Sequence, residues 1–397
     1  MQKPALTCLS TFTGLGGLDL GLEAAGFRHV ASVEWDECAR RSIKANRGDR
    51  WNLLAEGDIQ AVAASLLPAD LGLERGELDL LAGAPPCQPY SKAGQWVVGA
   101  RQGLGDRRAQ YLDDFMALLA AFQPKVALIE NVRGFVSGRT SALDHITAAL
   151  ERGRTTVGCP YRVEHRVIDA ADLGVPQHRA RAIIVISRID APFNWPAPTE
   201  GSTAWDAIGG QKLADEPPEL RGKWAGLLPS IPEGHNYLWH TNRGGGKQIF
   251  GYRTRYWSFL LKLAPGAPSW TLSAQPGPAT GPFHWDNRPL AIEEMLRLQS
   301  FPSGWIVEGS TRGEKVRQIG NATPPLLAEA VGLSIAAHIK GDDLVAAPEV
   351  FIVRRRRSVP ERRTPSAVPQ RYLKMVGEHP DHPGHGKGPG VASELHP

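Results

Sequence analysis

Short apolar runs alternate with longer segments of helical periodicity in the first half of the chain. The runs have the length and flanks of buried strands, and they cover residues 6–10, 30–34, 78–82, 126–130, 162–168 and 182–187. Between them, apolar positions at helical spacing predict helices over residues 36–46, 112–122 and 141–151. This alternation predicts an α/β fold with a doubly wound, mostly parallel sheet.

The last two predicted strands, 162–168 and 182–187, are joined without a helix-length segment. We therefore expect an antiparallel hairpin at the edge of the otherwise parallel sheet, with residues 177–181 opening the edge strand. Helical periodicity returns at 291–299 and 326–339. The chain is thus expected to come back and complete its first domain.

Composition changes along the chain, and it predicts four parts. Residues 189–287 hold seven of the eleven tryptophans with little periodicity, which predicts a second, smaller and irregular domain. Beyond residue 340 the chain is rich in proline and arginine, which predicts a disordered tail. The predicted parts are 1–188, 189–287, 288–340 and 341–397.

Composition and charge exclude several classes of protein. With 397 residues, 42% of them hydrophobic, the chain can bury a large core, and four widely spaced cysteines suggest neither a zinc site nor a disulfide framework. We expect no metal and a reducing compartment. The amino terminus lacks the apolar region of a signal peptide, and no apolar run reaches the length of a membrane span, so we expect a cytoplasmic protein.

Net charge is only +4, so its distribution matters more than its sum. Residues 221–262 contain seven basic residues and one acidic residue among several aromatic ones, a pattern that favours phosphate binding. Residues 352–374 carry eight basic residues against one acidic residue, which would allow nonspecific contact with DNA.

A cysteine follows the third predicted strand in the run Pro85-Pro86-Cys87-Gln88. Ligands of open α/β sheets bind at the carboxyl ends of the strands, and two prolines stiffen the loop that presents the thiol. A buried structural cysteine is the ordinary alternative for such a residue taken alone.

Glycines and acids follow the other strands of the same sheet. Gly14, Gly16 and Gly17 can permit close backbone approach to a cofactor, although their spacing is not that of the dinucleotide-binding pattern. Glu34-Trp35 ends the second strand, where a carboxylate can accept from ribose hydroxyls and an indole can lie on adenine. This pair indicates an adenosine-containing cofactor.

Further acidic and basic residues stand at the same predicted edge. Asp58 follows a third, weak strand and could accept from an adenine amino group, although helix capping is the ordinary role of such a residue. Glu130-Asn131 ends the fourth run, which places a carboxylate near Cys87. Strand alternation puts Arg179 and Arg181 on one face, where a structural salt bridge is the alternative.

In their order and spacing, these segments resemble the C5-cytosine-specific DNA methyltransferase family, which uses S-adenosyl-L-methionine. The resemblance covers residues 5 to about 340 and includes two further segments, 288–302 and 320–325. Three positions depart from the family pattern without removing a reacting group: Ala291 replaces threonine, Tyr90 replaces phenylalanine and Thr323 replaces valine.

The resemblance implies a class I methyltransferase fold in which 1–188 is the catalytic and cofactor-binding domain and 189–287 recognises the target sequence. It implies that Cys87 adds to C6 of a flipped-out cytosine and that a loop from residue 88 to about 110 closes over the base. The implied catalytic residues are Cys87, Glu130, Asn131, Arg179 and Arg181. The implied cofactor-binding residues are Phe12, Gly14, Gly16, Gly17, Glu34, Trp35, Asp58, Ile59, Pro86, Asn321 and Thr323. The implied DNA-binding residues are Gln88, Ser91, Arg101, Arg243, Lys247, Arg253 and Arg255.

Double-stranded DNA is the expected partner of a monomer, and a cognate restriction endonuclease would act separately. Three alternatives stay open from the sequence. The same catalytic motifs serve tRNA methylation, but the large tryptophan-rich insertion favours DNA. A catalytically silent DNA-binding regulator is disfavoured, because it would not need Cys87, Glu130, Arg179 and Arg181 together. An NAD-dependent enzyme would leave the Pro-Pro-Cys loop unexplained.

Overall fold

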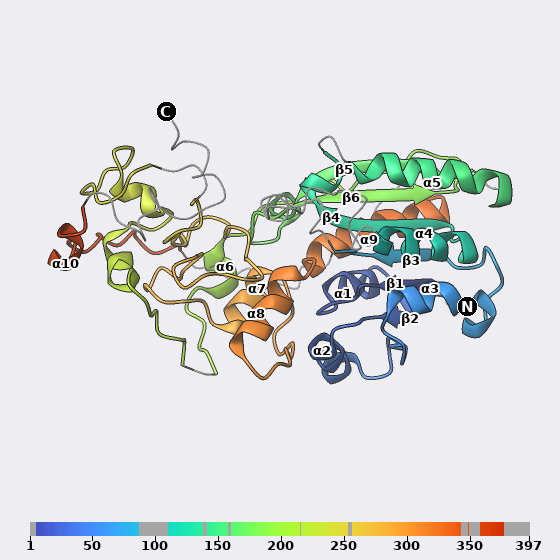
Figure 1. Ribbon diagram of the computed structural model, residues 1–397, viewed down its shortest axis with the longest axis horizontal. Coiled ribbons are helices and arrows are strands. Elements are labelled where there is room, and N and C mark those ends of the chain that lie inside the picture. Colours follow the sequence, from blue (N-terminus) through green and yellow to red (C-terminus); the bar gives the residue numbers. More distant parts are fainter. Residues whose placement is uncertain are drawn as a thin grey trace, which may run out of the picture.

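The computed structural model describes residues 5–86, 110–137, 141–157, 160–214, 216–252, 256–342, 348 and 358–376. A sheet flanked by helices forms one half of the molecule and a loop-rich module forms the other (Figure 1). The strands are β1 (Leu6–Thr11), β2 (Phe27–Val33), β3 (Leu80–Gly83), β4 (Val126–Val132), β5 (Arg162–Asp169) and β6 (Ala180–Ser187). All six correspond to predicted apolar runs.

The sheet order is β2-β1-β3-β4-β6-β5, with the first four strands parallel and β6 antiparallel to both of its neighbours. The expected antiparallel hairpin is confirmed, but the prediction that residues 177–181 open the edge strand is wrong. β6 is buried on both faces and lies inside the sheet, whereas β5 has many exposed positions and forms the edge. Polar positions suit an edge because only one side of that strand is paired.

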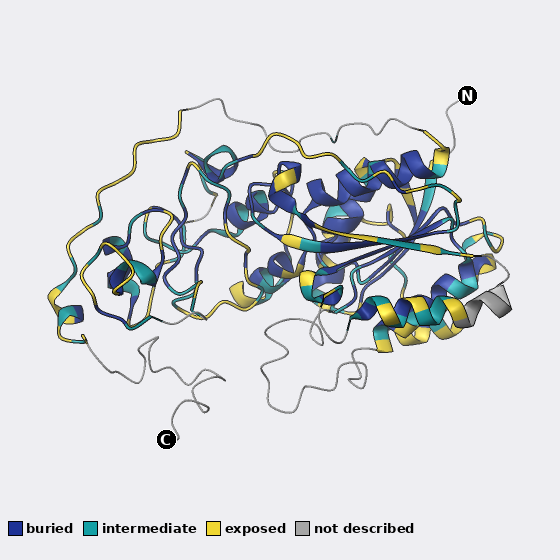
Figure 2. Cartoon of the chain, turned by 90° about the horizontal axis from the view of Figure 1, so that it is seen from above, coloured by how far each residue is buried: buried dark blue, intermediate teal, exposed yellow. Residues whose placement is uncertain are grey.

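Helices cover both faces of the sheet, and strand alternation divides the core between them. Leu80 and Ala82 of β3 face the cluster that contains α9 (Pro325–Lys340), whereas Leu81 faces the cluster that contains α4 (Gln110–Phe122). α1 (Gly17–Ala24) packs with α9 on the first face, and α3 (Ile59–Ser65) packs with α4 on the second. Figure 2 shows the buried strands between these layers, with α5 (Ala142–Val157) on the outside.

The return of the chain to its first domain is confirmed by α9, which lies where residues 326–339 predict it. Residues Arg312–Lys340 have the length and hydropathy of a membrane span, but 89% of their most apolar 18-residue window is buried inside the fold. Ala322–Pro324 interrupt this stretch between α8 (Arg312–Asn321) and α9. Both helices are therefore core elements.

A third cluster joins the two halves of the molecule. It combines α2 (Glu37–Arg47), α6 (Ala204–Ile208), α7 (Ile292–Leu298) and α8 around Trp51 and Trp285. Residues of the predicted second domain therefore share a core with the return segment. Among the residues that the structure describes, the short 3-10 helices are η1 (Pro68–Leu71), η5 (Arg133–Phe135), η6 (Ala170–Leu173), η7 (Ala225–Ser230) and η8 (Tyr237–His240).

The loop-rich module has its own aromatic core, and part of the predicted disordered tail completes it. Tyr372 of α10 (Gln370–Leu373) is fully buried and stacks on Trp224, with ring centroids 5.7 Å apart. Its hydroxyl donates to the Lys223 carbonyl at 3.0 Å, and Arg363 forms an ion pair with Asp286 at 2.6 Å. The prediction of disorder is wrong for 358–376, because a proline- and arginine-rich composition gives no sign that Tyr372 is anchored in a core. Most of the remaining tail lies outside the described residues.

Tyr372→Ala should destabilise the loop-rich module by about 3–5 kcal/mol, since it removes a fully buried aromatic ring. Urea unfolding of the full chain, followed by tryptophan fluorescence, should show a lower midpoint for the transition that reports Trp224. Gln370→Ala, an exposed change in the same helix, is the control. Equal midpoints for the two variants would contradict the anchoring role of Tyr372.

Candidate active site

The predicted site residues gather where the parallel strands end. β1 and β3 pair Thr11 with Gly83, and β3 and β4 pair Gly83 with Ile129. The glycine loop after β1, the Pro-Pro loop after β3 and Glu130 in β4 therefore lie along one edge of the sheet. Of the predicted residues, Cys87, Gln88, Ser91, Arg101, Arg253 and Arg255 lie outside the described residues.

An acid and a base meet in the middle of this edge. Arg181 pairs with Val132 across β4 and β6, which puts its side chain diagonally beside that of Glu130. Arg181 Nε lies 2.8 Å from Glu130 Oε1, and the two side chains are 12% and 7% exposed. The contact is an ion pair without hydrogen-bond alignment, because Oε1 has no hydrogen-bond partner among the described residues. Both charged groups are largely buried, so removing either one would leave the other as an unpaired buried charge, which destabilises the fold.

Asn131 links this pair to the loop that precedes Cys87. It is 3% exposed, and its Nδ2 donates to the Pro85 carbonyl at 2.9 Å. Its Oδ1 accepts from the Val132 amide at 2.9 Å, which fixes the orientation of the side-chain amide. Asn131 therefore holds the backbone two residues before the cysteine.

Arg179 points to a different part of the chain from Arg181. Arg179 is 1% exposed, and its guanidinium donates to the Gly320 carbonyl at 2.8 Å. Its backbone amide donates to Asp169 at 2.8 Å. The contact with Gly320 connects the start of β6 to the end of α8, whereas Arg181 stays with Glu130.

A buried amide network joins four segments that are far apart in sequence. Gln177 Nε2 donates to Gln299 Oε1 at 3.1 Å, and Gln299 Nε2 donates to the Ile319 carbonyl at 2.6 Å. Both glutamines are fully buried. Gln177 Oε1 also accepts from the Leu272 amide at 3.0 Å. Four segments are thereby held in register behind the site.

At the cofactor side, Glu34 holds the glycine loop. Its Oε2 accepts from the Gly14 amide at 2.6 Å, and its Oε1 accepts from the Asp36 amide at 2.7 Å. Burial raises the pKa of the Glu34 carboxyl, and the hydrogen bonds from Asp36 and Gly14 oppose that rise. Each oxygen keeps a lone pair for a further donor, so the carboxylate can still accept from a ribose.

Trp35 stands beside this carboxylate with 71% of its surface exposed. An exposed indole next to a buried carboxylate, with a glycine backbone close by, fits an adenosine group. Phe12 has a left-handed backbone with φ of 56°, and its ring meets Tyr111 edge to face at 6.1 Å between centroids. Sequence reasoning missed Tyr111, because nothing in its local pattern distinguishes it from a core residue.

The other predicted cofactor residues divide between packing and capping. A Cβ on Gly17 would lie 2.0 Å from the Thr323 carbonyl oxygen, and one on Gly16 would lie 2.5 Å from the Trp51 ring. Gly17 therefore lets α1 approach the return segment, and Gly16 lets the turn before α1 approach Trp51. Asp58 caps α3 by accepting from Gln60 at 3.0 Å, as the ordinary alternative predicts. The third weak strand expected before Asp58 is reduced to a single bridge between Ser32 and Leu53.

The remaining cofactor residues differ in exposure. Ile59 and Thr323 are buried, Pro86 is half-buried and Asn321 is exposed.

The basic region, residues 221–262, has an exposed turn in its described part. Gly245 and Gly246 wrap closely around the Trp239 indole, with their Cβ positions 2.7 and 2.4 Å from it, and the turn leaves Arg243 and Lys247 exposed. Lys262 does not belong to that surface. It is 4% exposed and donates to the Ile231 carbonyl, and burial lowers its pKa to about 8.

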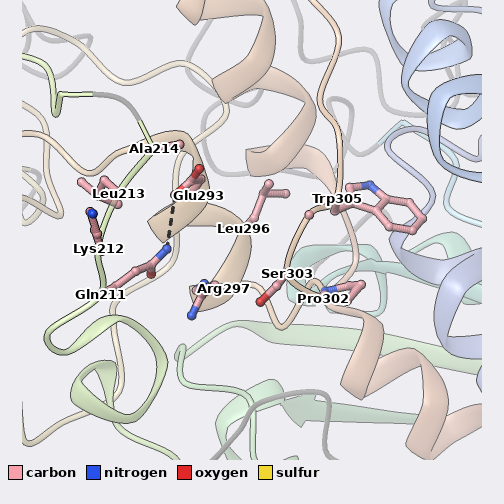
Figure 3. Close-up of a pocket in the computed structure, with 11 residues that line it drawn as sticks. Gln211, Lys212, Leu213, Ala214, Glu293, Leu296, Arg297, Pro302, Ser303 and Trp305 are labelled. Atoms are coloured by element: carbon pink, nitrogen blue, oxygen red, sulfur yellow. Dashed lines mark hydrogen bonds between the residues drawn. The ribbon is translucent and has the colours of Figure 1, made fainter.

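An open cavity of about 590 Å³ lies between residues 211–214, α7 and the loop that carries Trp305 (Figure 3). Gln211 Nε2 donates to Glu293 across it at 3.3 Å. None of its lining residues belongs to the predicted catalytic or cofactor set. The cavity is therefore separate from the strand-end site.

A buried polar cluster under the glycine loop was not predicted. Asp19 in α1 and His29 in β2 are 0% and 3% exposed, and His29 Nε2 lies 3.4 Å from Asp19. Burial raises the pKa of Asp19 to about 7 and lowers that of His29 to about 3. At neutral pH the His29 imidazole is thus uncharged and the Asp19 carboxyl is near the midpoint of its titration, so the contact is not an ion pair.

The chain is similar to known proteins over most of its length. Residues 6–337 match the family model for C-5 cytosine-specific DNA methylase. The type II methyltransferase M.SacI of Streptomyces achromogenes is 33% identical over 366 residues, which cover 82% of this chain and 91% of M.SacI. M.NgoFVII of Neisseria gonorrhoeae, also a type II methyltransferase, is 31% identical over 341 residues, covering 82% and 84%.

Solved structures share the fold. A prophage-encoded DNA modification methyltransferase of Escherichia coli aligns with a TM-score of 0.59 and 21% identity, over 85% of this chain and 100% of its own. The S. pombe Dnmt2 methyltransferase aligns with a TM-score of 0.52 and 17% identity, over 84% and 98%.

Asp19→Asn should change how stability depends on pH. In the folded chain Asp19 keeps its proton up to about pH 7, whereas unfolded aspartate loses it near 3.8, so acidification between these values stabilises the wild type through Asp19. His29 opposes this effect below pH 6.5, because only the unfolded histidine takes up a proton until about pH 3. The variant should lose stability relative to wild type on acidification from pH 7 to 4, by up to about 1.4 kcal/mol per pH unit.

Urea denaturation at half-unit pH steps measures this difference. Asp49→Asn, at an exposed position, is the control and should follow the wild-type curve. A constant offset between Asp19→Asn and wild type from pH 4 to 7 would show that Asp19 does not hold a proton in the fold.

Proposed function

The chain belongs to the C-5 cytosine-specific DNA methylase family, and from this premise we propose how its residues methylate cytosine. The reaction transfers a methyl group from S-adenosyl-L-methionine to C5 of a cytosine in DNA. We propose that Cys87 forms a transient covalent bond to C6, and that Glu130 and Arg181 bind the base while the bond forms. The buried ion pair between Glu130 and Arg181 is the observation that supports this assignment most directly.

The chemistry requires a nucleophile because C5 of cytosine attacks carbon poorly by itself. Addition of the Cys87 thiolate to C6 moves the electron pair of the C5–C6 bond through the ring towards N3. When the base binds, Glu130 would leave its ion pair with Arg181, take a proton from solvent and pass it to N3 as that charge develops, and Arg181 would donate to O2. Asn131, which holds Pro85, would keep the cysteine loop at the distance that the addition needs.

The addition leaves an enamine whose C5 can accept a methyl group. When bound, S-adenosyl-L-methionine supplies that group on a sulfonium. Glu34, Trp35 and the Gly14 backbone would hold its adenosine part, because they combine an acceptor, an exposed ring and a close backbone approach. Loss of the C5 proton to a solvent base then expels the Cys87 thiolate and restores the aromatic ring.

The loop-rich module would read the DNA sequence. We propose that the exposed turn with Arg243 and Lys247 contacts the duplex, and that Gln88, Ser91, Arg101, Arg253 and Arg255 add to the DNA surface. Guanidinium and ammonium groups can bind phosphates or the guanine edge in the major groove. Residues 189–287, completed by 358–376, thus serve target recognition beside the catalytic part.

The named relatives are type II methyltransferases, which supports a role in restriction and modification. We propose that the protein protects cytoplasmic DNA from a separate nuclease that cuts the same sequence, and that it acts as a monomer. Bisulfite sequencing of DNA from cells that express the protein would identify the sequence and the modified cytosine. Unmodified DNA throughout would contradict the proposal.

Glu130→Gln should lower kcat for methyl transfer by about 10²–10⁴-fold, because the amide cannot pass a proton to N3. Cys87→Ala should abolish transfer and also abolish the denaturant-resistant adduct that we expect wild type to form with 5-fluorocytosine DNA. Incorporation of labelled methyl groups measures the first effect and denaturing electrophoresis the second. Glu151→Gln, at an exposed position of α5, is the control. A wild-type enzyme that is active without forming an adduct would refute the covalent route.

Trp35→Ala should weaken binding of S-adenosyl-L-methionine about tenfold without changing the urea midpoint, since the indole is 71% exposed. Isothermal titration calorimetry without DNA measures this constant. Leu67→Ala removes another exposed apolar side chain, 58% exposed and outside the strand-end site, and should leave the affinity unchanged. An unchanged constant for Trp35→Ala would remove the indole from the cofactor site.

A further inference from the structure

Two tryptophans lie exposed beside each other where the loop-rich module meets the start of β6. Trp257 is 49% exposed and Trp270 is 39% exposed. Their rings meet edge to face, with centroids 5.4 Å apart and planes at 79°. Exposed indoles are unfavourable in water unless a partner covers them, so a paired and solvent-facing arrangement suggests an interaction surface.

The backbone that carries Trp270 is fixed on one side by the start of β6. The His178 amide donates to the Ser269 carbonyl at 2.7 Å, and the Ser269 amide donates to the Pro176 carbonyl at 2.9 Å. Leu272 donates to the buried Gln177 side chain. Residues 269–272 are therefore held in the same amide network as the catalytic edge.

The other side of this segment packs against α8. A Cβ on Gly320 would lie 2.4 Å from the backbone of Ala274, so the two segments are in close contact. Arg179, which donates to the Gly320 carbonyl, ties the same contact to β6. The Trp270 indole thus projects from a segment that is held on both sides.

Trp257 is anchored separately. The side chain of Asn236, itself 4% exposed, donates to the Trp257 carbonyl at 2.7 Å. The next residues enter the module core through Phe259, which packs against Trp224 and Tyr237. Both indoles are therefore presented by ordered backbone, and little conformational entropy would be lost when they bind a flat partner.

The pair lies close to the proposed chemistry. The Trp270 ring is 5.6 Å from the His178 ring, centroid to centroid. Arg181, the partner of Glu130, follows His178 by three residues, which is about 10 Å of extended chain. If a cytosine of a bound duplex reaches Glu130, we expect the bases next to it to lie near Trp257 and Trp270.

We propose that Trp257 and Trp270 form an aromatic step that stacks on a DNA base left exposed when the target cytosine leaves the duplex. The proposal rests on the proposed function, because it requires a cytosine rotated out of paired DNA. Extrusion breaks stacking and pairing, and any group that covers the exposed base makes the open state less costly. Aromatic rings do this for every base, since each base has a π-face. The two tryptophans would thus favour rotation of the cytosine out of the duplex, whereas polar residues would recognise the sequence.

Two duplexes that carry the site found by bisulfite sequencing test this role. One is fully paired, and the other has an abasic position opposite the target cytosine, so that pairing no longer holds the cytosine in place. Trp270→Ala and Trp257→Ala should each lower kcat/KM for the paired duplex about tenfold or more. On the abasic duplex the loss should shrink to about twofold or less, because opening no longer limits the reaction.

Trp270→Phe keeps an aromatic face and should recover most of the activity on paired DNA, whereas Leu67→Ala, remote from the site, should behave as wild type on both duplexes. Calorimetry with S-adenosyl-L-methionine and urea midpoints verify that each variant is folded. Equal losses on the paired and abasic duplexes, or no loss on either, would overturn the aromatic step. A wild-type enzyme inactive on both duplexes would instead refute the proposed function and this inference with it.

Discussion

The architecture of the site depends on a small set of buried amide hydrogen bonds. Gln177 and Gln299 lie more than a hundred residues apart, yet they bond to each other in the interior, and Gln299 continues to the Ile319 carbonyl. A buried amide group without its hydrogen-bond partner would lower the stability of the fold by about 1–3 kcal/mol, so each glutamine specifies the position of the other. The start of β6, the end of α7 and the end of α8 are consequently aligned by the same bonds.

This alignment determines what the strand ends can present. Arg179 fixes the end of α8 to the start of β6, and two residues later Arg181 is free to pair with Glu130 inside the sheet. Asn131, next to Glu130, holds the loop that leads to Cys87. The edge therefore combines rigid strands with a loop that Asn131 holds at the Pro85 carbonyl. On the cofactor side, Glu34 plays the corresponding part by binding the glycine loop through the Gly14 amide.

Much of the fold and of the candidate site was predictable because it depends on local pattern. Six apolar runs became the six strands, and the residues that follow parallel strands necessarily meet at one edge. Glu130, Arg181 and Glu34 were placed on this edge by their positions in the chain alone. α8 was missed although Thr311 and Glu314 form a capping box, because its apolar positions are few.

Features that arise only from tertiary packing were not predictable. The inward position of β6 depends on what covers its two faces, and Asp19 resembles an ordinary charge in the first turn of a helix until His29 is placed against it. Tyr372 lies in a segment whose composition indicates disorder, and only its contact with Trp224 shows that it is core. In each case the deciding partner is distant in sequence.

The docking of Tyr372 has a consequence for how the molecule is assembled. Its hydroxyl bonds to a carbonyl 149 positions earlier in the chain, in a module whose other aromatic residues are synthesised first. During translation the core of that module therefore stays incomplete beside Trp224 until Tyr372 is synthesised, which happens after the return segment and α9. The loop-rich module is thus completed after the sheet and its covering helices, so a nascent chain would acquire its catalytic scaffold before the module that we propose for sequence recognition.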